Sequence, residues 1–209
     1  MSQKRRPSSA RWIAEHENDP YVKEARRLGY RSRATFKLRE IQERDRILRL
    51  GQVVVDLGAA PGGWSQLARP LLGPHGRLLA LDILPMDPLP DVEVVTGDFR
   101  DAAVLADLQA RVGARAVDLV MSDMAPNVTG IDAADQVGQI HLCELALEFA
   151  RLHLRPGGGF LTKAFQGEGF DAFLHTLRQE FETVTIRKPK ASRPRSREVY
   201  LLARSRKRV

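Results

Sequence analysis

The feature that most constrains the fold is a regular alternation of short apolar runs with longer helical patterns. The apolar runs predict strands near 53–56, 77–83, 92–96, 117–122, 158–164, 182–188 and 198–203. Helices are expected near 20–28, 33–45, 63–72, 101–112, 134–154 and 169–180. Mostly apolar strands separated by helices predict a parallel sheet that is covered by helices on both faces.

The last two strands depart from this pattern. Only the segment PKASRPRSR, which contains two prolines and no helical pattern, separates them. A parallel crossover needs about a dozen or more residues, usually helical, so this pair should be antiparallel. The sequence therefore predicts an α/β fold with a seven-stranded, doubly wound, mostly parallel sheet and one antiparallel strand at its end.

Length and composition indicate one soluble domain. The 209 residues suffice for a single hydrophobic core, and no apolar stretch is long enough to span a membrane. The single cysteine, Cys143, cannot form an internal disulfide, so the cytoplasm is the default location. We expect a basic tail at 1–18, one domain at 19–203 with a helical, RNA-facing extension at 19–50, and a basic tail at 204–209. A monomer is the default state.

Charge is distributed unevenly along the chain. Residues 1–50 carry 14 Lys or Arg against 7 Asp or Glu, residues 178–209 carry 11 against 3, and residues 51–177 carry 8 against 16. Two basic ends around an acidic centre predict a positive surface that binds a polyanion such as nucleic acid. The alternative is a set of solvated loop arginines. The candidate RNA-binding residues are Arg31, Arg33, Lys188, Lys190, Arg193, Arg195 and Arg197.

A glycine-rich turn, DLGAAPGGWS at 56–65, follows the first strand of the sheet. In an open parallel sheet, ligands bind beyond the carboxyl ends of the strands at the switch point, and Gly58 would let the backbone approach such a ligand closely. The glycine spacing is not the G-x-G-x-x-G of a dinucleotide site, and no Gly-Lys-Ser/Thr follows as in a phosphate-binding P-loop.

Two carboxylates follow the next two strands. Asp82 could accept hydrogen bonds from both hydroxyls of a ribose, and Asp98 could accept one from an adenine amino group. Nothing nearby would neutralise a diphosphate, so the implied ligand is an adenosine without phosphate, and S-adenosylmethionine fits. The alternative is that these residues only cap strand ends, as Asp commonly does, and we retain that interpretation for Asp56.

Several motifs are similar to those of a known family. DLGAAPGGWSQ, LDILPMDP, GDFRD, SDMAPN, TKAFQGEG and RSREVY resemble the FtsJ-type ribose 2′-O-methyltransferases, from about Arg11 to Ala203. The resemblance implies a Rossmann-like sheet and S-adenosylmethionine as methyl donor. It also implies methylation of a uridine in 23S ribosomal RNA of the large ribosomal subunit. The implied cofactor contacts are Gly62, Trp64, Asp82, Asp98 and Asp123.

The same resemblance assigns Lys37, Asp123, Lys163 and Glu198 to the family's K-D-K-E catalytic tetrad. By spacing alone, Lys37 either faces inward with the apolar stripe of its helix or extends from the edge of that stripe. Lys163 lies in an apolar strand, where a lysine is costly unless it is paired. Glu198 stands alone among arginines and would ordinarily form a surface ion pair.

The reaction asks little of the protein, because the sulfonium methyl group is already activated. It needs orientation of the ribose hydroxyl and removal of one proton. We hypothesise that Lys163 is the base; if the nearby carboxylates keep it charged, it only orients the hydroxyl and stabilises the oxyanion. Asp123 would position the hydroxyl and the methyl donor, while Lys37 and Glu198 would place the nucleotide or tune Lys163.

Two absences favour ribose over a base as methyl acceptor. DMAPN lacks the aromatic residue found in amino-group methylases, and Cys143 lies in the amphipathic run HLCELALEF, a core position unsuited to a nucleophile. The five histidines show no metal-ligand spacing and read as surface or helix residues, so no metal is expected. The segment 127–138 is a candidate mobile lid.

Three alternatives stay open at this point. A nicotinamide oxidoreductase would share the sheet, and a 2′-O-methyltransferase of transfer RNA or of an RNA cap would share the tetrad. A non-catalytic RNA-binding ribosome-assembly factor could retain the whole scaffold. The motifs LDILPMDP and AFQGEGF favour ribosomal RNA through resemblance alone.

Overall fold

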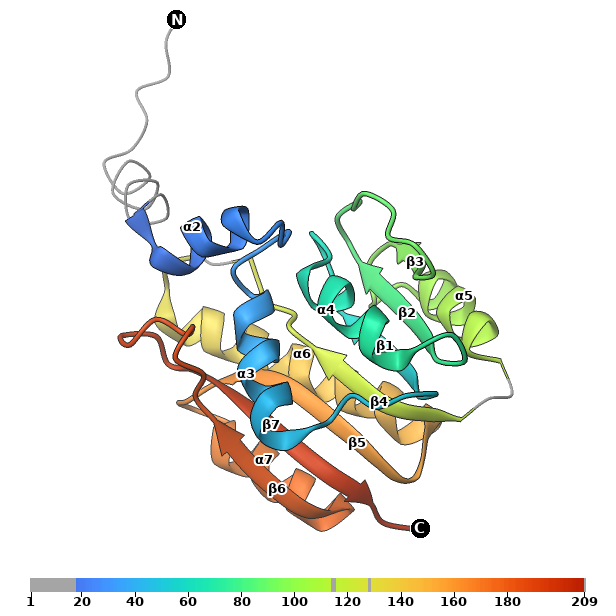
Figure 1. The fold of residues 1–209 in the computed structure, drawn as a ribbon. Helices are drawn as coiled ribbons and strands as arrows, with labels where there is room; N and C mark the ends of the chain where they lie inside the picture. The colour runs from blue at the N-terminus through green and yellow to red at the C-terminus, as the bar shows by residue number, and fades with distance from the viewer. Residues whose placement is uncertain (1–17, 114–115, 128, 209) are drawn as a thin grey trace, which may run out of the picture.

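The computed structural model describes residues 18–113, 116–127 and 129–208 and shows one sheet with the strand order β3-β2-β1-β4-β5-β7-β6 (Figure 1). The strands are β1 (Val53–Leu57), β2 (Arg77–Asp82), β3 (Glu93–Thr96), β4 (Val117–Ser122), β5 (Leu154–Phe165), β6 (Phe181–Arg187) and β7 (Glu198–Arg206). The chain winds outward in opposite directions from β1 and β4. The crevice at their carboxyl ends is therefore the expected ligand site.

The direction of the strands follows from the lengths of their connections. Strands β1 to β5 pair in parallel, whereas β7 is antiparallel to both β5 and β6. The connection 188–197 contains no helix and is too short for a parallel crossover. The predicted sheet with one reversed strand at its end is confirmed, and β7 lies one position in from the edge.

Helices cover both faces of the sheet. One side carries α3 (Thr35–Asp45) and α4 (Gly63–Leu72), with α2 (Pro20–Arg27) packed on α3, and the other side carries α5 (Ala102–Val112), α6 (Asp132–His153) and α7 (Phe170–Glu180). Val54 packs toward α3 and α4, while Val53 and Val55 pack toward the opposite helices. Successive strand side chains point to opposite faces, so the fully buried run of β1 serves both layers.

The C-terminal boundary of the domain was predicted too early. Strand β7 continues to Arg206, and Arg204 and Arg206 pair with β6, so 204–206 belong to the sheet and not to a tail at 204–209. The basic side chains concealed this extension, because the ladder between two strands uses backbone groups and does not require apolar side chains.

Strand β5 also begins earlier than predicted, at Leu154 directly after α6. Its register against β4 shifts between Val117 and Leu119, so the first part of the strand is irregular. The polar, glycine-rich start of this strand gave no apolar run from which it could be predicted.

Part of the proposed lid is helical. Residues 132–138 form the first turns of α6, and Asp135 accepts hydrogen bonds from the backbone N–H groups of Thr129 (2.7 Å) and Gly130 (3.2 Å). Of the predicted N-terminal tail 1–18, all but the last residue lies outside the described part of the chain. Within the described part, no helix is both long enough and apolar enough to span a membrane.

Candidate active site

A cavity of about 500 Å³ opens at the carboxyl ends of β1, β2 and β4, where the sheet predicts a ligand site. Four of the predicted cofactor residues, Gly58, Asp82, Asp98 and Asp123, line this cavity. Gly58 has a φ of 77°, and a Cβ atom there would lie 2.7 Å from Met124. Only glycine therefore allows this turn to pack against the β4 end of the cavity.

The Asp82 carboxylate binds backbone N–H groups of two segments of the cavity wall. Its Oδ2 accepts a hydrogen bond from the N–H of Ala60 (2.8 Å), and its Oδ1 accepts one from the N–H of Leu84 (2.8 Å). Each carboxylate oxygen has two acceptor sites. The carboxylate can therefore fix the glycine turn and still accept hydrogen bonds from a pair of ribose hydroxyls.

Asp98 is engaged by a residue that the sequence did not single out. Arg100 Nε lies 3.0 Å from Oδ1 and Nη2 lies 2.6 Å from Oδ2. This guanidinium lowers the pKa of Asp98 to about 2. The carboxylate is thus an acceptor at neutral pH, and its predicted contact with an adenine amino group would share it with Arg100.

The other two predicted cofactor residues, Gly62 and Trp64, do not line the cavity. Gly62 precedes α4 with a φ of 103°, and a Cβ atom there would lie 2.9 Å from Arg31 Nη1. The Trp64 ring is buried between α3 and α4, and its Nε1 donates to the carbonyl of Ala34 (2.9 Å). Any ligand contact from these two residues would have to use their backbone.

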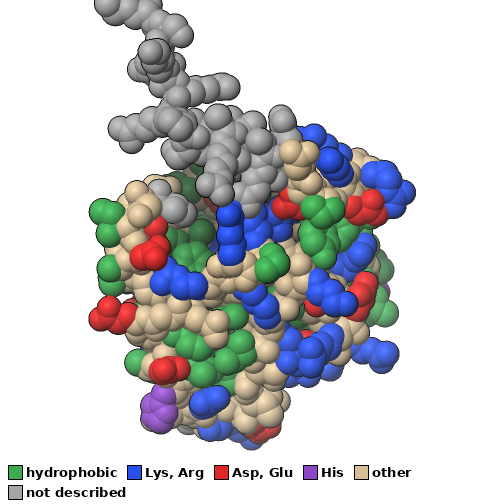
Figure 2. Space-filling view, turned by 90° about the vertical axis from the view of Figure 1, so that its left-hand side faces the viewer, with side chains coloured by type: hydrophobic (Ala, Val, Ile, Leu, Met, Phe, Trp, Pro, Cys, Tyr) green, Lys and Arg blue, Asp and Glu red, His purple; other side chains and the backbone are tan. Residues whose placement is uncertain are grey.

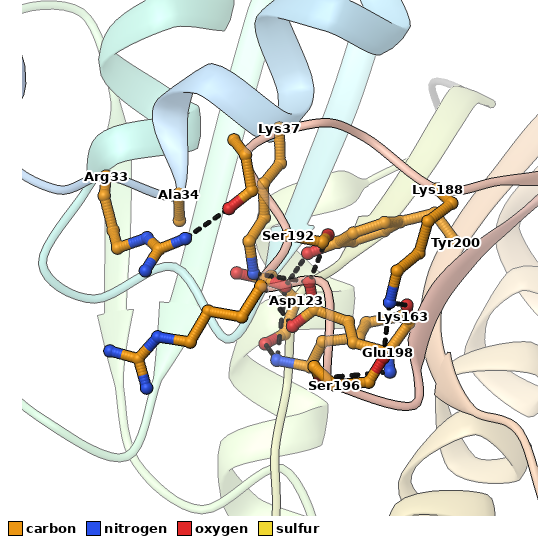
Figure 3. A network of polar contacts seen from close by, with 12 residues as sticks. Arg33, Ala34, Lys37, Asp123, Lys163, Lys188, Ser192, Ser196, Glu198 and Tyr200 are labelled. Atoms are coloured by element: carbon orange, nitrogen blue, oxygen red, sulfur yellow. Dashed lines mark hydrogen bonds and ion pairs between the residues drawn. The ribbon is translucent and has the colours of Figure 1, made fainter. Parts of the chain in front are cut away.

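The four predicted tetrad residues come together from four different elements (Figure 3). Lys163 Nζ on β5 donates to the carbonyl of Asp123 at 2.6 Å and lies 3.2 Å from its Oδ1. Lys37 on α3 lies with its Nζ 2.7 Å from Oε1 and 2.8 Å from Oε2 of Glu198 on β7. The Lys37 side chain is only 12% exposed, so it faces inward and does not extend from the edge of its helix.

Tyr200 connects the two ion pairs and was missed by the sequence. Its hydroxyl donates to Asp123 Oδ1 at 2.8 Å, and Lys37 Nζ lies 5.7 Å from the centre of its ring. It stands opposite Lys163 in the β5–β7 ladder and two residues after Glu198, so all three side chains share one face of the sheet. The strand period could have indicated Tyr200, but only if the register were known.

Burial and nearby charges set the ionisation of Asp123 and Tyr200 in this cluster. Burial acts to raise the pKa of Asp123, but the charges of Lys163 and Lys37 and the Tyr200 hydrogen bond outweigh it, so that pKa is lowered. Burial and the Asp123 and Glu198 charges hold the pKa of Tyr200 well above its usual value. Asp123 is therefore an ionised acceptor and Tyr200 a neutral donor near neutral pH.

Two side chains of α6 support the backbone of Lys163. Gln139 Nε2 donates to the carbonyls of Lys163 (2.8 Å) and Met124 (3.2 Å), and Cys143 Sγ donates to the same Lys163 carbonyl (3.0 Å). Burial raises the pKa of the Cys143 thiol. Cys143 is therefore a core residue, as predicted, and the ends of β4 and β5 are tied together just beyond their last paired residues.

Among the predicted RNA-binding residues, Arg31, Arg33 and Lys188 donate hydrogen bonds to backbone carbonyls of the protein. Arg31 donates to backbone carbonyls in two loops, and Arg33 bonds to Asp19 and to the carbonyl of Ala191. Lys188 donates to the carbonyls of Ser196 and Glu198. These side chains hold the N-terminal extension and the connection in place. The sequence gave their charge but not their partners.

The remaining four lie in the connection between β6 and β7. Lys190, Arg195 and Arg197 are exposed, with Arg197 lying 3.4 Å from Asp132, whereas Arg193 is half-buried and 4.0 Å from Asp19. A hollow of about 710 Å³ lies between this connection and the start of α2. Its lining includes Tyr21, Arg33, Lys190, Ser192, Arg193 and Arg195.

Ser192 joins this hollow to the charged cluster, because its hydroxyl donates to Glu198 Oε1 at 2.7 Å. Among the described residues, no group of three or more His, Cys, Asp or Glu is arranged to hold a metal ion. His141 lies on α6 and lines the cavity.

The sheet is doubly wound with one reversed strand, and a glycine turn and carboxylates lie at the ends of its first strands. This combination defines the class of Rossmann-like methyltransferases. Within that class, the profile of the FtsJ-like methyltransferases matches residues 30–206. The chain belongs to the FtsJ-like methyltransferase family, which confirms the predicted family and removes the nicotinamide oxidoreductase from consideration.

Curated relatives and a solved structure are similar to nearly the whole chain. The chain is 60% identical over 95% of its length to the ribosomal RNA large subunit methyltransferase E of Azoarcus sp., covering 97% of that protein. It is 59% identical over 96% of its length to the enzyme of the same name from Pseudomonas aeruginosa, again covering 97%.

The solved structure is a crystal structure of a ribosomal RNA methyltransferase from Plasmodium falciparum. The two share 25% identity with a TM-score of 0.77, over 85% of this chain and 98% of that one.

Proposed function

We propose that this protein transfers a methyl group from S-adenosylmethionine to the 2′-hydroxyl of a uridine in 23S ribosomal RNA of the large ribosomal subunit. The observation that carries the proposal is the Lys163–Asp123 pair, which lies beside the cavity at the switch point of the sheet. The names of relatives about 60% identical to this chain support ribosomal RNA as the substrate.

The cavity suits the methyl donor chemically. Its volume falls within the range of small-molecule sites, about 300–1,000 Å³. Asp82 would accept the ribose hydroxyls and Asp98 the adenine amino group, while the backbone at Gly58 gives close access. The charge of Arg100 is already neutralised by Asp98, so the site has no unpaired cation suited to a diphosphate among these residues.

In the proposed reaction, the ribose 2′-oxygen attacks the methyl carbon in line with the carbon–sulfur bond. That bond breaks, its electron pair neutralises the sulfonium, and S-adenosylhomocysteine leaves. Lys163, acting as the base, takes the hydroxyl proton. Correct orientation of the reacting groups can lower the activation barrier by roughly 7–11 kcal/mol in favourable cases. Asp123, which is itself held by Tyr200, contributes to this by keeping Lys163 in place.

Lys37 and Glu198 would place the acceptor nucleotide. Their ion pair is mostly buried, with each side chain 12% exposed, and it borders the hollow through Ser192. A fixed pair of opposite charges next to a basic hollow can orient the ribose and its phosphate without taking part in proton transfer.

RNA binding would use the face formed by α2 and the connection between β6 and β7. Figure 2 shows Lys and Arg side chains spread over the face on this side of the molecule, interrupted by a few Asp and Glu. We assign phosphate contacts there to Lys190, Arg193, Arg195 and Arg197. Each neutralised phosphate of single-stranded RNA should contribute about −0.7 to the slope of log K against log salt concentration.

The test is transfer of tritium from labelled S-adenosylmethionine to RNA by the purified protein, with large subunits, free 23S RNA and transfer RNA offered separately. We expect label in large-subunit RNA, and a missing 2′-O-methyl uridine in RNA from cells that lack the protein. Label in transfer RNA would replace the substrate, and no label in any RNA would favour a non-catalytic assembly factor. We propose that the protein is cytoplasmic and monomeric. Sedimentation of the purified protein would check the monomeric state, and fractionation of cells would check the location.

A further inference from the structure

Arg31 occupies an unusual position between the N-terminal extension and the cofactor cavity. Its Nη1 donates to the carbonyls of Asp87 (2.6 Å) and Pro61 (3.1 Å), and its Nη2 donates to that of Pro88 (2.8 Å). One guanidinium therefore bonds to two loops that are far apart in sequence. These three partners are all backbone oxygens, so the side chain is bound to the protein's own loops.

The backbone around Arg31 is fixed as well. Its N–H donates to Gln66 Oε1 (2.9 Å), and Gln66 Nε2 donates to the carbonyl of Gly29 (2.8 Å). Residues 29–31 of the extension are thus attached to α4 through the Gln66 side chain. This attachment aims the guanidinium at the two loops and leaves it little freedom to reach outward.

Both loops continue from residues that line the cofactor cavity. Pro61 directly follows Ala60, which lines the cavity after β1, and Asp87 and Pro88 belong to the segment that follows the lining residues Ile83 and Leu84 after β2. A guanidinium bonded to both segments sets the distance between them. It does so from outside the cavity, where no ligand needs to touch it.

The absence of a side chain at Gly62 leaves room for the Arg31 guanidinium beside the turn. A Cβ atom on Gly62 would lie 2.9 Å from Arg31 Nη1, 3.2 Å from Arg31 Cδ and 3.2 Å from a methyl group of Leu89. The φ of 103° at Gly62 already favours glycine, and the missing Cβ atom also leaves room for the Arg31 side chain. Close approach of a cofactor is not needed to account for the glycine.

We propose that Arg31 is a positioning residue for S-adenosylmethionine and not a phosphate ligand for RNA. It acts by joining the glycine turn to the 83–90 segment. The inference rests on the proposed function for the identity of the ligand. The planar fork of arginine suits this task, because it can donate to several carbonyls at fixed angles, whereas a lysine offers one point charge.

The test compares Arg31→Met with Lys190→Met, a matched loss of one positive charge from the exposed connection. For Arg31→Met we expect the Kd for S-adenosylmethionine, measured by calorimetry, to rise by at least about fivefold, with kcat at saturating donor changed by less than about twofold. Its RNA salt slope should equal that of the wild type. Lys190→Met should show the reverse, an unchanged donor Kd and a slope smaller by about 0.7.

The conservative variant Arg31→Lys keeps the charge and should fall between wild type and Arg31→Met in donor affinity. It also provides the measurement if Arg31→Met does not fold. A donor Kd equal to wild type in Arg31→Lys and Arg31→Met, or a smaller RNA salt slope in Arg31→Met, would overturn the inference. Failure of the wild-type protein to bind the donor would instead overturn the proposed function, so the two failures are distinct.

Discussion

Lys163 of β5 and Tyr200 of β7 stand directly opposite each other in the antiparallel ladder, and both hydrogen-bond to Asp123 at the end of β4. Three strands thus contribute one side chain each to a single buried cluster. The reversed direction of β7 makes this possible, because it brings the start of that strand next to the carboxyl ends of β4 and β5.

The first prediction concerns the proton acceptor. Lys163→Arg keeps a positive charge and a long side chain, but a guanidinium cannot give up its proton in proteins. We expect methyl transfer to fall by about 10²–10⁴ while the Kd for the donor changes little. Single-turnover kinetics with labelled donor would measure this. A rate within about tenfold of wild type would show that Lys163 only orients the hydroxyl.

The second prediction concerns Tyr200. Tyr200→Phe removes the hydroxyl that donates to Asp123 but keeps the ring, which packs 5.7 Å from the ring of Trp64. A hydrogen bond to a charged group is worth about 1.5–3 kcal/mol, so methyl transfer should slow by roughly tenfold or more. The thermal midpoint should move by only a few degrees. If Tyr200→Phe is fully active, the Asp123–Lys163 pair is positioned without it.

The architecture could be predicted from sequence because it depends on local patterns. The apolar runs marked every strand, and the helix over 63–72 and the strand over 117–122 were predicted with the observed bounds. The short, proline-containing connection before Glu198 predicted the direction of β7. These features need no knowledge of which strands are neighbours.

The site was predictable only where one residue type stood out against its surroundings. Lys163 in an apolar strand is such a case, and the family motif supplied Lys37 and Glu198. Tyr200 and Gln139 were missed because their roles depend on register and on which face of α6 is buried. Neither can be read from a single sequence.

The candidate RNA-binding residues were chosen by charge alone. Charge marked Arg31, Arg33 and Lys188 as RNA ligands, but each has partners within the protein. Arginine and lysine can donate hydrogen bonds to backbone carbonyls as well as to phosphates. Net charge along the chain therefore predicts a basic surface but does not show which of its side chains are held by partners within the protein.

The third prediction is a pH-dependent stability that originates below the cofactor cavity. Asp56 on β1 is fully buried, and its Oδ2 accepts a hydrogen bond from Ser65 Oγ at 2.7 Å. Its Oδ1 has no hydrogen-bond partner among the residues that the structure describes. Burial raises the pKa of Asp56 to about 7. Because the folded pKa exceeds the unfolded one, the group favours folding most at low pH and loses that contribution as the pH rises toward neutrality.

Asp56→Asn removes this titration and keeps the shape of the side chain. Relative to wild type, its free energy of unfolding should rise by about 3 kcal/mol between about pH 5 and about pH 8. Urea denaturation at constant ionic strength would measure it. A difference between the two proteins that does not change with pH would show that the Asp56 carboxyl does not titrate in this range.

The last prediction is a coupling between Lys37 and Glu198, which lie far apart in the sequence and form an ion pair at 2.7 Å with each side chain only 12% exposed. Removing one partner leaves a mostly buried charge without its counter-charge, which typically costs about 3–5 kcal/mol. Removing both leaves neither charge. The double variant Lys37→Met, Glu198→Gln should therefore be more stable than the sum of the single changes predicts, by about 1–3 kcal/mol.

Denaturant unfolding of the wild type, both single variants and the double variant gives this coupling energy directly. Arg151 and Glu180, whose ion pair lies at 2.5 Å with side chains 41% and 24% exposed, provide a surface pair for comparison and should couple by less than about 1 kcal/mol. Equal coupling in the two pairs would mean that the Lys37–Glu198 pair is screened by water. It would then be free to rearrange around a nucleotide and would not be a fixed element of the site.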